Sequence, residues 1–331
     1  MRNRPALGVA VSFLWKVANS GYQWRDIPEQ GRVLCAVDAF QLDWNNMFGR
    51  YQRSYRPFHE VTGLFLEFAD LEPNETAIVE FVNRYGMLGI GDNIFAPSDF
   101  GVVRLHGETL EWWRGKIETL RSAVDLWRAM QKGKEELLST LKKQLGDPDQ
   151  LPMKVRHLQH LDDQDPAMAA LSVIQRSASY VLRQELSFDF LFAGNEPRLQ
   201  LSLRPVSLMA AIWLQFAAAV EERRSFEKCK NCGRPFEISR AASIGKRSDA
   251  KFCSTRCRVG SYHVRIEQAR RLAKSGVPLA KIAEEVGSDV ATVRRWIKSV
   301  QKPTKRQTSK GSRPGATSPA RPSARSKSSL K

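Results

Sequence analysis

Four of the five cysteines in this chain of 331 residues occur in two close pairs. Cys229 and Cys232 stand in the segment CKNCGRPF, and Cys253 and Cys257 stand in CSTRC. Gaps of two and three residues let both sulfurs of a pair reach one ion, and two such pairs complete the tetrahedron that Zn²⁺ prefers. Because four thiolates leave no coordination position for water, the spacing predicts one structural Zn²⁺ ion within residues 225–261.

The sequence around the cysteines is basic. Four thiolates leave a Zn²⁺ site with a charge of about −2. Five flanking residues would offset this charge: Lys228, Lys230, Arg234, Arg256 and Arg258. Gly233 suits a tight turn in which backbone N–H groups point at sulfur. A redox dithiol and an iron–sulfur cluster are the alternatives for the same four residues. The low cysteine content otherwise indicates a reducing, cytoplasmic setting.

A second motif follows the cysteines. The segment VPLAKIAEEVGSDVATVRRWI, at 277–297, has the spacing of a helix-turn-helix, and 262–276 predicts a further helix that packs against it. The inward positions are Ile282, Ala283, Val286, Val293 and Trp296, with Gly287 at the turn. In this motif the second helix enters the major groove of DNA. The residues predicted to contact DNA are Val290, Ala291, Thr292, Arg294, Arg295 and Lys298. An ordinary helical hairpin is the alternative.

The net charge of +17 belongs to the C-terminal third of the chain. Residues 225–331 contain 26 Lys and Arg against 7 Asp and Glu, whereas residues 1–224 contain 26 against 28. This asymmetry predicts a polyanionic partner at one end of the molecule. Residues 301–331 carry nine of the basic residues and no acidic one. Their Pro, Ser, Lys and Arg content predicts a disordered basic tail that attracts phosphate.

Residues 1–224 predict a mostly helical domain with minor strand content. Helical spacing of apolar residues or apolar runs predict helices at 74–89, 107–146 and 206–224, and alternation predicts a strand at 198–205. The most apolar segment, 207–220, is too short to cross a membrane and fits a buried helix. We therefore expect no membrane association.

Catalytic motifs are absent from residues 1–224, whose role stays unknown. The tryptophans there fit core packing better than a ligand pocket. His157 and His160, near two aspartates, fit an exposed loop better than a metal site. Asp38, Asp43 and Glu80 are acidic candidates for a nuclease, although no spacing singles them out. The chain is therefore not expected to be an enzyme.

Two stretches resemble known families. AKIAEEVGSDVATVRRWI resembles the helix-turn-helix of resolvases, invertases and related homeodomain-like bacterial regulators. CKNCGRPFEISR, followed by KRSDAKFCSTRCRVGSYHVR, is similar to the zinc-finger segment of the CGNR-type family of bacterial proteins. In that family a helical N-terminal domain precedes the finger. The resemblance implies a bacterial transcription regulator.

These observations predict a mainly α protein with four parts. They are a helical domain at 1–224, a four-cysteine zinc module at 225–261, a three-helix helix-turn-helix domain at 262–300 and the basic tail at 301–331. The expected partner is double-stranded DNA, bound in the nucleoid by a chain that forms a homodimer if its site is palindromic. Two alternatives stay open: a nucleic-acid-processing enzyme of a mobile element, and an RNA-binding adaptor.

Overall fold

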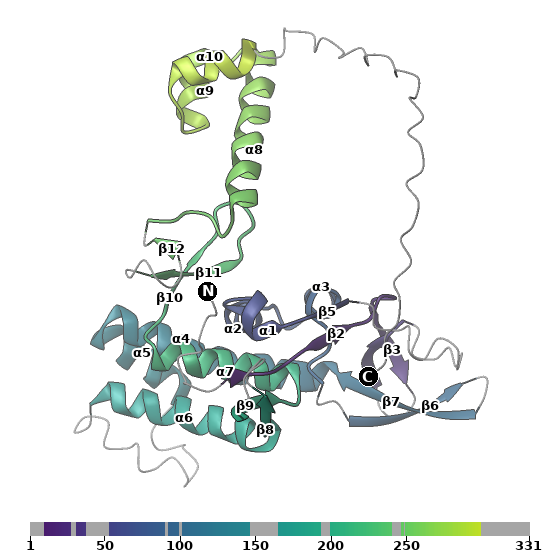
Figure 1. Ribbon diagram of the computed structural model, residues 1–331. Coiled ribbons are helices and arrows are strands. Elements are labelled where there is room, and N and C mark those ends of the chain that lie inside the picture. Colours follow the sequence, from purple (N-terminus) through teal and green to yellow (C-terminus); the bar gives the residue numbers. More distant parts are fainter. Residues whose placement is uncertain are drawn as a thin grey trace, which may run out of the picture. The chain divides into compact units, whose positions relative to one another are not determined.

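The fold is seen in a computed structural model that describes residues 10–27, 31–37, 53–89, 92–98, 101–145, 165–192, 199–239, 246–247 and 249–298 (Figure 1). The chain divides into two compact units, Met1–Ser261 and Tyr262–Lys331. Among the described residues helix is the main element and strands are short, which confirms the mainly α prediction in this coarse form. The predicted basic tail, 301–331, and His157 and His160 lie outside the described residues.

Helices build the core of the first unit. They are α1 (Pro57–Glu60), α2 (Leu64–Ala69), α3 (Glu75–Tyr85), α4 (Leu110–Lys132), α5 (Lys134–Leu145), α6 (Pro166–Glu185) and α7 (Leu208–Glu221). Helix α7 is buried on nearly all sides, which explains its continuous apolar sequence. Trp113, Trp127 and Trp213 are buried in the same core, as expected for packing residues. Of the helices described, none is long and apolar enough to span a membrane.

Local signals set the ends of α3. The side chain of Asn74 accepts a hydrogen bond from the backbone N–H of Ala77 at 3.0 Å, which caps the first turn. Gly86 ends the helix with a φ of 87°, a conformation that favours glycine. Ile78, Phe81, Val82 and Tyr85 are buried on one face. The helix predicted at 74–89 is therefore confirmed.

The helix predicted at 107–146 is wrong in two respects, because residues 107–109 lie in strand β7 (Gly101–Thr109) and the chain breaks the rest into α4 and α5. Gly133 lies between the two helices with a φ of 126°, and its N–H still bonds the carbonyl of Ala129 at 3.2 Å. A positive φ of this size is open to glycine but strained for other residues, so the helix ends there. The amphipathic pattern continues through Gly133, since Leu137 and Leu141 of α5 join the same core as α4.

The strands of the first unit form several small sheets. Their bounds are β1 (Ala10–Val11), β2 (Trp15–Val17), β3 (Tyr22–Ile27), β4 (Gly31–Ala36), β5 (Arg53–Tyr55), β6 (Asp92–Ser98), β7 (Gly101–Thr109), β8 (Leu186–Phe192) and β9 (Leu199–Pro205). The sheet orders are β3-β4-β7-β6, β1-β9-β8 and β2-β5. Strand β9 is the strand predicted at 198–205. It pairs with β8 in a hairpin and with β1 in parallel.

The last sheet of the first unit, β10-β11-β12, leads to the cysteines. Its strands are β10 (Ser225–Lys228), β11 (Pro235–Ser239) and β12 (Lys246–Arg247). Phe226 of β10 packs into the helical core, with its ring centroid 5.4 Å from that of Phe65 and 6.3 Å from that of Trp127. Lys228 forms an ion pair with Asp70 at 3.0 Å. Residues 225–239 are thus packed against the helices rather than separated from them.

Three helices make up the described part of the second unit. Helix α8 (Thr255–Lys274) begins in the first unit and continues into the second, and α9 (Leu279–Glu285) and α10 (Val290–Lys298) follow it. Their small core consists of Ala269, Ile282, Ala283, Val286, Val293 and Trp296, all buried. Gly276 and Gly287 turn the chain between the helices with φ values of 77° and 60°.

Candidate metal centre and exposed face of α10

The turn between β10 and β11 carries the first two cysteines. Strands β10 and β11 pair in antiparallel register, with Lys228 opposite Pro235. Inside the turn, the N–H of Gly233 bonds the carbonyl of Cys229 at 2.8 Å, and the N–H of Cys229 bonds the carbonyl of Arg234 at 2.9 Å. Gly233 has a φ of 72°, which fits the tight turn that the sequence predicted. Cys229 and Cys232 are therefore placed on one side of a short hairpin.

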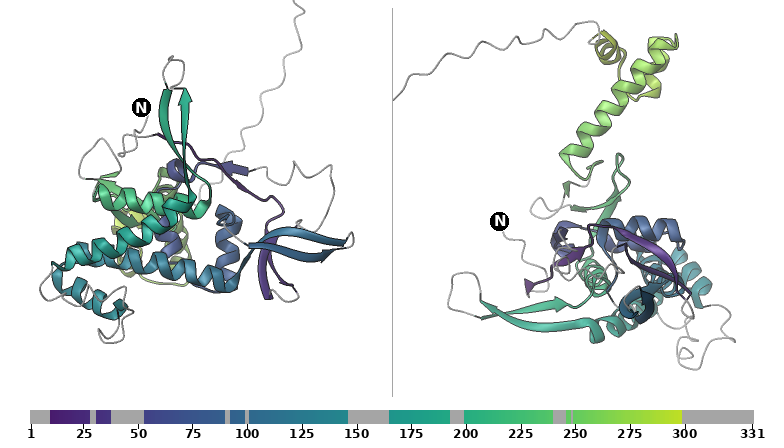
Figure 2. Two further views of the ribbon diagram at one scale, coloured as in Figure 1. Left: turned by 90° about the horizontal axis from the view of Figure 1, so that it is seen from below. Right: turned by 90° about the vertical axis from the view of Figure 1, so that its right-hand side faces the viewer.

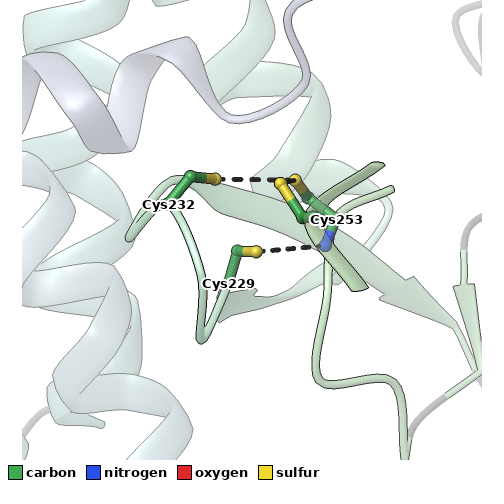
Figure 3. A group of neighbouring side chains, drawn as sticks. Cys229, Cys232 and Cys253 are labelled. Atoms are coloured by element: carbon green, nitrogen blue, oxygen red, sulfur yellow. Dashed lines mark hydrogen bonds between the residues drawn. The ribbon is translucent and has the colours of Figure 1, made fainter. Parts of the chain in front are cut away.

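The second pair of cysteines lies at the start of α8. Cys253 precedes the helix, and Cys257 lies in its first turn, where its N–H bonds the hydroxyl oxygen of Ser254 at 3.1 Å. A backbone hydrogen bond of 3.0 Å from Lys230 to Lys251 joins this segment to the hairpin. Figure 3 shows Cys229 and Cys232 of the hairpin facing Cys253 of this second segment.

The sulfur atoms are grouped closely enough for one ion. The Sγ atom of Cys253 lies 3.6 Å from that of Cys232 and 3.4 Å from that of Cys257. All four Sγ atoms, including that of Cys229, lie within 4.8 Å of one another. A tetrahedron with Zn–S bonds of ~2.3 Å has edges of about 3.8 Å, close to these separations. The four cysteines are positioned to hold a metal ion.

Hydrogen bonding and burial divide the four thiols. Burial raises the pKa of Cys229, but backbone N–H groups, among them that of Cys253 at 3.4 Å, outweigh it and lower this pKa to about 6. Burial and the neighbouring thiols of Cys257 and Cys232 raise the pKa of Cys253 to about 12. Four adjacent thiolates repel one another, so a divalent cation is what would allow all of them to ionise. The donor set therefore fits a thiolate-bound metal.

Basic residues flank the cysteines of this candidate metal centre in the sequence. Cys229 is almost fully buried, at 2% exposure, whereas Cys232 is exposed. The nearby basic residues are exposed: Lys228, Lys230, Arg234, Lys251, Arg256 and Arg258. A site of four thiolates and one divalent cation would carry negative charge, which basic residues close to it in the sequence would offset. His263, which follows these cysteines on α8, is not among the grouped residues.

All six predicted DNA-contacting residues lie on α10. The carboxylate of Asp289 accepts a hydrogen bond from the N–H of Thr292 at 2.8 Å and caps this helix. Val293 and Trp296 face the core and are buried. Val290, Ala291, Arg294, Arg295 and Lys298 are exposed, and Thr292 is half-buried. The helix therefore has one buried face and one open face with three basic side chains.

Contacts that the sequence did not reveal hold α10 on α8. The indole N–H of Trp296 donates to the hydroxyl oxygen of Tyr262 at 2.9 Å, and the two rings meet edge to face at 5.5 Å. Arg265 lies over the ring of Trp296 at 5.8 Å and bonds the carbonyl of Gly287 at 3.4 Å. Arg270 bonds the carbonyl of Trp296 at 3.1 Å. Tyr262 and Arg265 are three residues apart and therefore lie on one face of α8. This spacing was the sequence signal for their contacts with Trp296.

No family model matches the chain, and searches of curated proteins and of solved structures return no significant match. Of the acidic residues weighed for a nuclease, Glu80 is exposed on α3, and Asp38 and Asp43 lie outside the described residues.

Proposed function

We propose that this chain is a sequence-specific DNA-binding protein that regulates transcription in bacteria. In this proposal α9 and α10 form a helix-turn-helix, and the four cysteines hold one structural Zn²⁺ ion. The observation that carries the proposal is the division of α10 into a buried face and an open basic face. An α-helix with such a face fits the width of the major groove.

The roles of the α10 residues follow from their positions. In a helix-turn-helix the N-terminal residues of the second helix reach base edges, so Val290, Ala291 and Thr292 contact bases there. Apolar side chains of this size suit the methyl group of thymine. Arg294 and Arg295 lie one turn later, where a guanidinium group pairs with guanine or with phosphate. Lys298 at the end of the helix contacts phosphate.

The proposed zinc ion acts on the fold rather than on a substrate. Cys229, Cys232, Cys253 and Cys257 would hold it with four thiolates, which leaves no open position for a water molecule. It would tie the turn between β10 and β11 to the first turn of α8. Because ligand sets of this kind form only on folding, metal binding adds directly to folding free energy.

A double substitution tests the role of α10. Arg294→Ala with Arg295→Ala removes two exposed charges and leaves the buried residues of α10 in place, so the fold and the metal content should not change. Duplex affinity should fall, and the slope of log K against log salt should decrease by up to about 2, since each phosphate contact contributes ~0.9. The matched control, Lys142→Ala with Lys143→Ala on exposed positions of α5, should leave both quantities unchanged.

Equal duplex affinity for wild type and the α10 variant would refute the assignment. If duplex affinity falls as expected, selection of bound sequences from a random duplex pool, with the zinc-loaded chain, would define the DNA sequence that the protein binds. Cleavage of the duplex in the presence of Mg²⁺ would favour the nuclease alternative instead. Tighter binding of structured RNA than of duplex DNA across a range of salt would favour the RNA adaptor.

A further inference from the structure

An apolar groove lies on the first unit, and none of the four grouped cysteines lines it. It is an open cavity of ≈ 690 Å³ between α6, α7 and the start of β8. Its walls are mainly aliphatic side chains: Leu171, Ile174, Ala178, Leu182, Leu186 and Val220. Water in contact with such walls is unfavourable, so the groove gains free energy when an apolar surface fills it.

A protruding apolar surface stands beside the groove. Phe188 and Phe190 of β8 are 64% and 69% exposed, and Phe188 also lines the groove. Leu201, opposite Phe190 in the β8–β9 register, is 39% exposed. In Figure 2 the hairpin of β8 and β9 extends beyond the helices of this unit. Exposed apolar residues that form a contiguous patch are typical of interaction sites.

Strand β8 adds a hydrogen-bonding edge to this surface. Within the described residues, its sheet has the order β1-β9-β8, so β8 is an outer strand. Outer strands offer backbone N–H and C=O groups to another strand, and an apolar outer strand is especially prone to pairing. The protruding apolar surface, the groove and the edge of β8 are thus adjacent on the first unit.

The charges at the groove indicate which partner fits. Arg183 and Glu221, both exposed, line the groove together. An anionic or a cationic small molecule would meet one attractive and one repulsive charge there. A second copy of the same surface, rotated by a two-fold axis, presents Glu221 to Arg183 and Arg183 to Glu221. The charge pattern is therefore self-complementary.

We propose that this surface joins two copies of the chain in a two-fold symmetric dimer. The exposed phenylalanines of one copy fill the groove of its partner, and the reverse contact forms at the same time, as in an isologous interface. Arg183 of each copy faces Glu221 of the other at the rim. The inference does not depend on DNA binding, because every residue that carries it belongs to the first unit.

The oligomeric state of the full-length, metal-loaded chain tests this proposal. Sedimentation equilibrium should show a dimer for wild type, and Phe190→Glu should raise the dissociation constant of the dimer by 100-fold or more. The reason is that the two-fold axis places residue 190 in the interface twice, once from each copy, so one substitution removes two buried phenylalanines and buries two carboxylates. Val37→Glu places the same charge on an exposed apolar residue beside another sheet and should not change the dimer. A wild-type chain that stays monomeric at high concentration would overturn the proposal, as would a dimer unaffected by Phe190→Glu.

A charge exchange provides the second test. Arg183→Glu or Glu221→Arg alone creates like-charge pairs across the axis, and each should weaken the dimer. The double variant restores opposite charges and should recover most of the lost affinity. No recovery in the double variant would overturn the assigned pairing. Because these measurements use no nucleic acid, a failed dimer would not affect the test of α10, and a failed DNA assay would not affect this one.

Discussion

Replacement of Trp296 by alanine should unfold the second unit while the first unit stays folded. Trp296 is 6% exposed and is the largest side chain in a core of six buried residues. Its indole donates a hydrogen bond to Tyr262 and carries the Arg265 guanidinium over its face. Removal of a buried tryptophan costs about 3–5 kcal/mol, since packing is lost and a cavity remains.

That cost compares with a small total stability. The described part of the second unit, 262–298, has roughly 37 residues, for which a native stability of about 2–6 kcal/mol is typical. The substitution therefore removes most or all of the free energy of unfolding of this unit. Trp296→Phe is the matched control, because it keeps an aromatic ring against Tyr262 and loses one hydrogen bond, worth about 1 kcal/mol.

Amide hydrogen exchange followed by mass spectrometry measures both units in the same sample. In Trp296→Ala, peptides from 262–298 should lose protection, whereas peptides from α4 and α7 should keep theirs. Trp296→Phe should retain protection in both. If the peptides that contain Ala269, Ile282 and Val293 stayed as protected in Trp296→Ala as in wild type, the packing account of this unit would be refuted.

Three further predictions concern the first unit and the C-terminal segment. Cys232→Ser should lower the zinc content well below one ion per chain and weaken exchange protection in 225–239; unchanged metal by elemental analysis would contradict the site. Burial raises the pKa of Asp70, but the hydrogen bonds from Arg128 and Lys228 outweigh it and lower this pKa below its usual value of 3.8. The ionised carboxylate therefore stabilises the fold at neutral pH, and this stabilisation is lost when the pH falls through the lowered pKa. Asp70→Asn should therefore cost about 1 kcal/mol by chemical denaturation at neutral pH and nothing in strong acid, whereas a pH-independent cost would exclude the ion pairs as its source. Deletion of 301–331, with its nine basic residues, should reduce non-specific duplex binding and its salt slope more than sequence preference, and the reverse ranking would contradict the role given to that segment.

Local patterns in the sequence were sufficient for much of the helical structure and for the candidate metal centre. Apolar spacing identified the buried face of α3 and the division of α10 into core and open faces, because helical periodicity depends only on neighbouring residues. The cysteine spacing identified the four candidate metal ligands for the same reason, since the two cysteines of each pair are separated by only two or three residues. Gly287 was recognised from the local chemistry of turning.

Long-range contacts decided what the sequence pattern could not. The break at Gly133 was not apparent, since the apolar pattern of α4 continues into α5. Strand β9 pairs with β1, nearly two hundred residues earlier in the chain, and with β8 on its other side, so that β8, which carries Phe188 and Phe190, is the outer strand. The insertion of Phe226 among Phe65 and Trp127 likewise depends on residues that only the folded chain brings together. Periodicity therefore determined which face of each helix is apolar, whereas tertiary packing decided what covers that face and which apolar surface stays open.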